Sequence, residues 1–98
     1  MSDTDTTVHT TTKIKIPSMW KVILHNDDFT PMDFVMQVLL QIFNKSKEEA
    51  MRLMMHVHEQ GKATVGLYTK EIAETKVLQT MTAAEAYSHP LLATTEEA

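Results

Sequence analysis

Apolar positions recur with two periods along most of the chain, and each period predicts a kind of element. Residues 20–25 are rich in β-branched and aromatic side chains and predict a strand, which the polar residues 26–28 end. A helix is expected next, because five apolar residues recur at spacings of three and four. They are Val35, Val38, Leu39, Ile42 and Phe43. Thr30 is expected to cap this helix, Pro31 to stand at its first helical position, and Asn44 to end it in the left-handed conformation.

A second helix is predicted between two boundary signals. Ser46 and Glu49 have the spacing of a capping box, and Gly61 suits the left-handed turn that ends many helices. The predicted helix has one apolar stripe, formed by Ala50, Leu53, Met54 and Val57.

The last third of the chain predicts a strand, a helix and a strand. Residues 62–68 predict a strand because two sets of side chains alternate along them. One set is Ala63, Val65 and Leu67, and the other is Thr64, Gly66 and Tyr68. Thr69 is expected to cap a helix that runs to about Tyr87 and ends before Pro90, and residues 91–95 predict a short final strand. The inward-facing residues of that helix would be Ile72, Ala73, Val77, Thr80 and Ala84.

The predicted order is therefore β-α-α-β-α-β. If successive elements run antiparallel, the first strand fits between the other two with an antiparallel neighbour on each side. The expected fold class is α+β, a two-layer sandwich of three helices over a three-stranded antiparallel sheet. This core domain would span residues 19–98. Residues 1–18 begin with a threonine-rich segment that lacks apolar periodicity, and they are expected to form a flexible N-terminal tail.

Composition narrows the functional class. The 98 residues carry a net charge of −4 and their Lys and Arg residues are scattered, which argues against a nucleic-acid partner. No stretch has the length of a membrane span and the N-terminus lacks a signal-peptide pattern, so an intracellular protein without a membrane partner is expected. The absence of cysteine excludes disulfides and thiol nucleophiles. Eight methionines fit either an irregular core or an adaptable binding surface.

The sequence offers no catalytic constellation and no cofactor motif. Gly61 and Gly66 are its only glycines, so a phosphate-binding loop is absent. His56 and His58 are two residues apart and would point to nearly opposite sides of a helix, which argues against a metal site. A small aminopeptidase would also recognise an α-amino group, but it needs a metal cluster or a nucleophile with its base. The chain is therefore predicted to be a binding protein and not an enzyme.

A binding site is predicted where the loop after the first strand meets two helices. Two helices joined by a short turn pack antiparallel, so the start of the first should lie near the end of the second. The rim of the site would be polar (Asn26, Asp27, His58) and its lining apolar (Met32, Val35, Met54, Val57). Such a site suits a ligand with a cationic head, such as an α-amino group, and an apolar body. In the alternative interpretation the lining is ordinary core, His58 is a satisfied buried histidine, and Asp27-Asp28 is a turn that bonds to its own backbone.

Four segments of the chain match the sequence pattern of one known family. They are residues 21–32, 57–62, 71–76 and 89–92. The most specific part of the match is Asn26-Asp27-Asp28 followed by Thr30-Pro31-Met32. Over these four segments the chain resembles the ClpS family, adaptors that deliver N-end-rule substrates to a Clp protease. The resemblance implies the fold predicted above and a location in the bacterial cytosol. It implies as ligand the N-terminal residue of a substrate protein, chiefly Leu, Phe, Tyr or Trp.

The resemblance also implies a role for each candidate residue. The free α-amino group would be bound by Asn26, Asp27 and His58. The substrate side chain would lie in a pocket shaped by Asp28, Thr30, Met32, Val35, Met54, Val57 and Leu91. Met32 would act as a gate that rejects the β-branched residues Val and Ile. Glu71, Glu74 and Lys76 would dock on the N-terminal domain of the unfoldase ClpA or its relative ClpC, and the tail before residue 18 would help to hand the substrate over.

A structural interaction domain that binds no N-terminal residue is the main alternative. The C-terminal domain of the ribosomal stalk protein has the same topology, and a shared fold does not fix a function. That alternative leaves the polar rim unexplained. Phe29 stands where many members of the family have Tyr, which removes one hydroxyl near the site. Nothing in the sequence requires more than a monomer.

Overall fold

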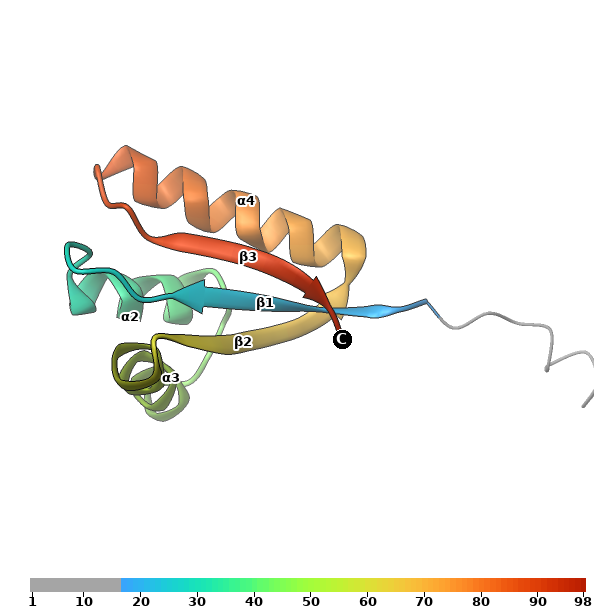
Figure 1. The fold of residues 1–98 in the computed structure, drawn as a ribbon, viewed down its shortest axis with the longest axis horizontal. Helices are drawn as coiled ribbons and strands as arrows, with labels where there is room; N and C mark the ends of the chain where they lie inside the picture. The colour runs from blue at the N-terminus through green and yellow to red at the C-terminus, as the bar shows by residue number, and fades with distance from the viewer. Residues whose placement is uncertain (1–16) are drawn as a thin grey trace, which may run out of the picture.

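Residues 17–98 are described by the structure, a computed structural model. The expected flexible tail lies, up to residue 16, outside the described residues. From residue 17 onward the elements follow the predicted order β-α-α-β-α-β (Figure 1). They are β1 Met19–His25, α2 Met32–Gln41, α3 Lys47–Gln60, β2 Lys62–Thr69, α4 Lys70–Ala86 and β3 Leu92–Glu97.

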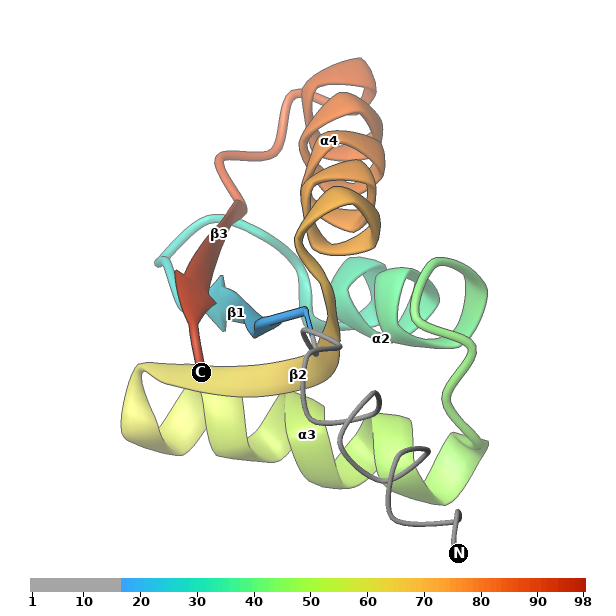
Figure 2. The ribbon, with the colours of Figure 1, turned by 90° about the vertical axis from the view of Figure 1, so that its right-hand side faces the viewer.

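The strand β1 lies in the centre of a three-stranded sheet with the order β2-β1-β3, and both pairings are antiparallel. α4 packs against all three strands, whereas α3 packs against β2 and against α2. Among the described residues, the helices gather on one face of the sheet and leave the other face without a helix (Figure 2). The predicted α+β two-layer sandwich is confirmed.

The apolar stripes of the helices face the sheet and form the core. All the predicted inner residues of α2 and α3 are buried except Ile42, which is partly buried. In α4 the inner stripe consists of Ala73, Val77, Thr80 and Ala84. The expectation that Ile72 faces inward is wrong, since its side chain is 49% exposed. Ile72 precedes the stripe by one residue, which turns its side chain about 100° away from the sheet.

β2 departs from simple alternation at Val65. Gly66 and Thr64 pair with successive residues of β1, so Val65 between them is an extra residue and forms a β-bulge. Beyond the bulge the inward side of the strand changes. Tyr68 packs against the core and Leu67 is 53% exposed, so the prediction that Leu67 shares the inner face with Val65 is wrong.

The boundaries of α3 are those predicted from the sequence. The Ser46 hydroxyl accepts a hydrogen bond from the backbone N–H of Glu49 at 3.1 Å. The Glu49 carboxylate binds Arg52 instead of closing the capping box. Gly61 takes the left-handed conformation, with φ of 90°, where the chain turns from α3 into β2. Glycine adopts this conformation without the steric cost that a Cβ would bring.

The prediction that Thr30 caps α2 is wrong. Pro31 occupies the N-cap position without a side-chain cap, and the Thr30 hydroxyl donates to the Asp27 carboxylate instead. Asn44 does take a left-handed conformation, with φ of 54°, but α2 has already ended at Gln41. Thr69 stands at the N-cap of α4 as predicted, although its hydroxyl makes no capping bond.

Candidate functional site

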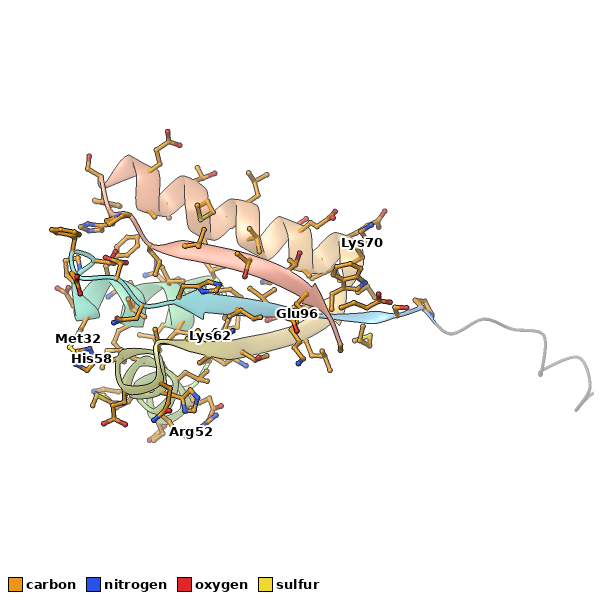
Figure 3. The ribbon with its side chains drawn as sticks, in the orientation of Figure 1. Met32, Arg52, His58, Lys62, Lys70 and Glu96 are labelled. Carbon is orange, nitrogen blue, oxygen red and sulfur yellow. The ribbon has the colours of Figure 1, made fainter. Side chains whose placement is uncertain are left out.

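Nine residues from three parts of the chain line a pocket of about 240 Å³. They belong to the loop after β1, the first turns of α2 and the last turns of α3. The lining residues are Asn26, Asp27, Asp28, Thr30, Met32, Val35, Met54, Val57 and His58. Met32 and His58 lie at the same end of the molecule, where α2 begins and α3 ends (Figure 3). The structure therefore brings together all but one of the predicted contact residues.

Leu91 is the predicted pocket residue that the structure places elsewhere. Its side chain is only 2% exposed in the core, and it borders a different hollow, next to Phe29 and His89. Leu91 precedes β3, which pairs with one edge of β1, whereas α3 packs against β2 on the other edge. The strand order thus separates Leu91 from the residues of α3.

A backbone hydrogen bond joins the loop after β1 to the end of α3. The N–H of Asn26 donates to the carbonyl oxygen of Gly61, with an N···O distance of 2.8 Å. His58 lies in the last turn of α3, three residues before that carbonyl. The turn at Gly61 therefore holds the imidazole of His58 and the side chain of Asn26 on the same rim.

The Asp27 carboxylate is anchored within its own loop. Its Oδ1 accepts hydrogen bonds from the backbone N–H groups of Phe29 (2.8 Å) and Thr30 (2.7 Å), and its Oδ2 accepts one from the Thr30 hydroxyl (2.7 Å). Partial burial acts to raise the pKa of Asp27, but these hydrogen bonds and the nearby His89 outweigh it and hold the pKa below its ordinary value. The turn interpretation is therefore confirmed for Asp27. Its carboxylate still contributes negative charge to the rim and has one acceptor position left on Oδ2.

The other polar groups of the rim are open to a ligand. The side chains of Asn26, Asp28 and His58 are exposed, and within residues 17–98 none of them makes a hydrogen bond to another side chain or to the backbone. Asn26 and Asp28 offer oxygen acceptors, and the neutral imidazole of His58 offers one nitrogen acceptor. The rim therefore presents several acceptors and a net negative charge, which suits a cation that carries N–H donors.

The walls of the pocket are apolar. Val57 is 2% exposed, Val35 7% and Met54 8%, so these side chains belong both to the core and to the pocket lining. Met32 is 41% exposed at the first position of α2 and stands at the edge of the pocket. An apolar side chain that entered this pocket would pack against these four residues and be removed from water, which favours binding.

Comparisons with known proteins show which family has this sequence and this fold. The profile of the family described as "ATP-dependent Clp protease adaptor protein ClpS" matches residues 15–94, which include the first five elements of the fold and the start of β3. The chain belongs to the ClpS family. It is therefore an adaptor of the Clp protease and not an enzyme. That assignment confirms the resemblance read from the sequence.

Several curated ClpS proteins are similar over most of their length. The ATP-dependent Clp protease adapter protein ClpS of Rhodospirillum centenum is 53% identical over 85 residues, which are 87% of this chain and 79% of that protein. The ClpS protein of Parvibaculum lavamentivorans is 54% identical over 84 residues, 86% of this chain and 76% of that protein.

A solved ClpS structure has the same fold. It is the structure of Agrobacterium tumefaciens ClpS2 bound to L-phenylalaninamide, which aligns with a TM-score of 0.82 at 38% identity. The alignment covers 85% of this chain and all of the other.

The three candidate docking residues of α4 have different surroundings. Glu71 and Glu74 are exposed near the start of the helix. Lys76 is partly buried, and its Nζ donates to the carbonyl oxygen of Ile42 at 2.6 Å and lies 6.0 Å from the centre of the Tyr68 ring. Lys76 therefore links α4 to the end of α2, a contact that the sequence pattern of an amphipathic helix did not reveal.

One further feature falls outside what the sequence predicted. Phe29 is 79% exposed beside the pocket, in the turn that Asp27 holds. The polar and charged residues around Phe29 have no apolar periodicity that could have predicted its exposure.

The described helices include none that is long and apolar enough to cross a membrane. Residues 17–98 also hold no group of three or more His, Asp or Glu side chains placed to bind a metal ion.

Proposed function

We propose that this adaptor binds the free N-terminal residue of substrate proteins in the pocket at the start of α2 and delivers them to a Clp unfoldase. The ligands would be chains that begin with Leu, Phe, Tyr or Trp. The observation that carries the proposal is that acceptor side chains and apolar walls meet at one pocket of about 240 Å³. A free α-amino group next to an apolar side chain is the ligand that complements both parts.

The α-amino group would be held by the rim. In this proposal Asn26 and His58 accept hydrogen bonds from its N–H donors, and the carboxylate of Asp27 adds charge and its remaining acceptor position. Charge-assisted hydrogen bonds of this kind are stronger than neutral ones, so an N-terminal ammonium would be favoured over an amide. N-acetylation would remove both the charge and two of the donors.

The substrate side chain would lie against the walls formed by Met32, Val35, Met54 and Val57, with Asp28 and Thr30 at the entrance. L-phenylalaninamide, which is bound to A. tumefaciens ClpS2, combines an α-amino group with an aromatic side chain and supports this ligand class. Met32 at the edge would exclude side chains branched at Cβ, because their bulk lies next to the rim.

Delivery would use the start of α4. Glu71 and Glu74 are exposed there, and we propose that they and Lys76 contact the N-terminal domain of ClpA or ClpC. In this proposal the adaptor acts as a monomer in the bacterial cytosol.

The proposal is tested by fluorescence anisotropy with short labelled peptides that begin with Leu, Phe, Val or Arg, and with an N-acetylated Leu peptide. Binding is expected for Leu and Phe, with weak binding for Val and none after acetylation. The Asn26→Ala variant should weaken binding of the Leu peptide by roughly tenfold, because it removes an acceptor for a charged donor. An absence of binding to all five peptides would reject N-terminal recognition. The protein would then be an interaction domain with a ClpS fold.

A further inference from the structure

All the sulfur atoms of this protein belong to methionine thioethers. The sequence has eight methionines and no cysteine, so an oxidant that reacts with sulfur has no thiol to consume it. Within residues 17–98 the well-exposed methionines are Met19 (41%), Met32 (41%) and Met51 (47%). Of these three, only Met32 lines the pocket.

We propose that Met32 is an oxidation-sensitive site that switches off ligand binding. This inference rests on the proposed function, because it concerns the same pocket. The reaction is oxygen transfer from a peroxide. The thioether sulfur of Met32 attacks one oxygen of hydrogen peroxide, the O–O bond breaks, an S–O bond forms and water leaves. Sulfur loses two electrons, the peroxide gains them, and the product is methionine sulfoxide.

The position of Met32 explains why oxidation would matter there. The backbone at the start of α2 is fixed, because the carbonyl oxygen of Pro31 accepts hydrogen bonds from the N–H groups of Phe34 and Val35. The Met32 side chain thus starts from a defined point at the pocket edge. A sulfoxide oxygen that turns toward the apolar walls is a strong acceptor, and Val35, Met54 and Val57, which form those walls, offer it no side-chain donor. Burial of such a group under an apolar ligand is unfavourable.

A second methionine of the pocket is protected from the same reaction. Met54 is only 8% exposed, because it belongs to the core as well as to the lining. Peroxide therefore reaches Met32 before Met54. The switch is also reversible, since reductases convert methionine sulfoxide back to the thioether.

The first test uses the full chain treated with hydrogen peroxide, with sulfoxide measured at each methionine by peptide mass spectrometry. The wild type should lose affinity for a Leu peptide by roughly tenfold as Met32 is oxidised, and methionine sulfoxide reductases should restore it. Met32→Leu, compared with its own untreated sample, should lose no affinity after the same treatment. Met51→Leu is the matched control, because it removes a methionine of similar exposure outside the pocket, and it should respond like the wild type.

Two outcomes would overturn the proposal. One is unchanged affinity in a wild-type sample in which Met32 is fully oxidised, and the other is an equal loss of affinity in Met32→Leu. A footprint gives a second measurement: saturating Leu peptide should slow oxidation of Met32 and leave that of Met19 and Met51 unchanged. Failure of the untreated protein to bind any peptide would instead reject the proposed function, so the two hypotheses are separable.

Discussion

At the scale of single residues, the loop after β1 combines a structural and a binding role in neighbouring side chains. Asp27 uses both carboxylate oxygens to hold the turn that carries Phe29 and Thr30. Asp28, one residue later, is exposed and lines the same pocket. The two acidic residues therefore differ in what their replacement should change.

Asp27→Asn should lower the free energy of unfolding by about 1 kcal/mol near neutral pH, because it weakens hydrogen bonds to an ionised acceptor. The pKa of Asp27 is lowered in the folded protein. Its ionised form therefore favours folding above the unfolded pKa of about 3.9, and this contribution is lost as the pH falls through the folded pKa. Urea unfolding at pH 7 and at about pH 3 should show a smaller acid-induced loss of stability for Asp27→Asn than for the wild type.

Asp28→Asn is the matched control for this experiment. Its side chain makes no hydrogen bond with another residue of the segment 17–98, so unfolding should match the wild type at both pH values. If the two variants lost stability equally, the turn would not depend on the carboxylate of Asp27.

His58 is the rim residue that offers a ring nitrogen as acceptor. His58→Ala should weaken binding of a Leu peptide by roughly tenfold, because it removes an acceptor for a charged donor. His58→Gln keeps an oxygen acceptor and should lose less affinity. Anisotropy titrations, with circular dichroism to verify the fold of each variant, measure both. Unchanged affinity of His58→Ala would remove His58 from the proposed contacts.

At the scale of the elements, the contact between Lys76 and Ile42 makes α4 depend on α2. The ammonium group satisfies a carbonyl at the C-terminal end of α2, where helix carbonyls lack partners within the helix and the dipole favours a positive charge. A residue proposed for docking thus also holds two helices together.

We expect Lys76→Ala to lower the free energy of unfolding by about 1 kcal/mol and also to weaken binding to the unfoldase domain. Glu71→Ala and Glu74→Ala should weaken that binding with unchanged stability, since both side chains are exposed. Urea unfolding and titration of the isolated N-terminal domain of ClpA or ClpC measure the two effects. Unchanged stability of Lys76→Ala would show that its bond to Ile42 contributes nothing in solution.

The helices and strands also show which structural features sequence patterns alone can predict and which they cannot. The stripes of α2 and α3 were predictable because helical periodicity alone decides which side chains meet the sheet. Leu67 was assigned to the wrong face because the bulge at Val65 is set by pairing with β1, which alternation within β2 does not contain. Thr30 was assigned a cap from its residue type and its place before the apolar stripe. In the structure its hydroxyl instead donates to the Asp27 carboxylate, a partner that residue spacing does not reveal.

At the scale of the whole molecule, antiparallel packing of α2 and α3 was enough to predict where the candidate pocket lies. The exception, Leu91, depended on the strand order, because β3 and α3 stand on opposite sides of β1. Which carboxylate anchors the loop depended on hydrogen bonds among side chains, which residue spacing does not determine. The sequence therefore predicts the location of the site more reliably than the role of each side chain within it.

The two proposed binding surfaces lie at opposite ends of β1. The pocket is at its C-terminal end, beyond His25, and the strand begins at Met19, about 20 Å away for seven extended residues. Figure 3 accordingly places Met32 and His58 at one end of the molecule and Lys70 at the other. At that far end Pro17, Ser18 and Glu71 line one hollow. The chain before residue 17 therefore joins the domain beside the proposed docking surface and far from the pocket.

Deletion of residues 2–16 should consequently leave the affinity for a Leu peptide within about twofold of the wild type, because every residue that lines the pocket lies between Asn26 and His58. The same deletion should slow degradation of a reporter that begins with Leu by a Clp unfoldase and its peptidase. A chain of equal length with a shuffled 2–16 segment is the control, and it should restore delivery if length matters more than order. Loss of peptide binding on deletion would contradict the spatial separation of the two surfaces and assign the segment to the pocket itself.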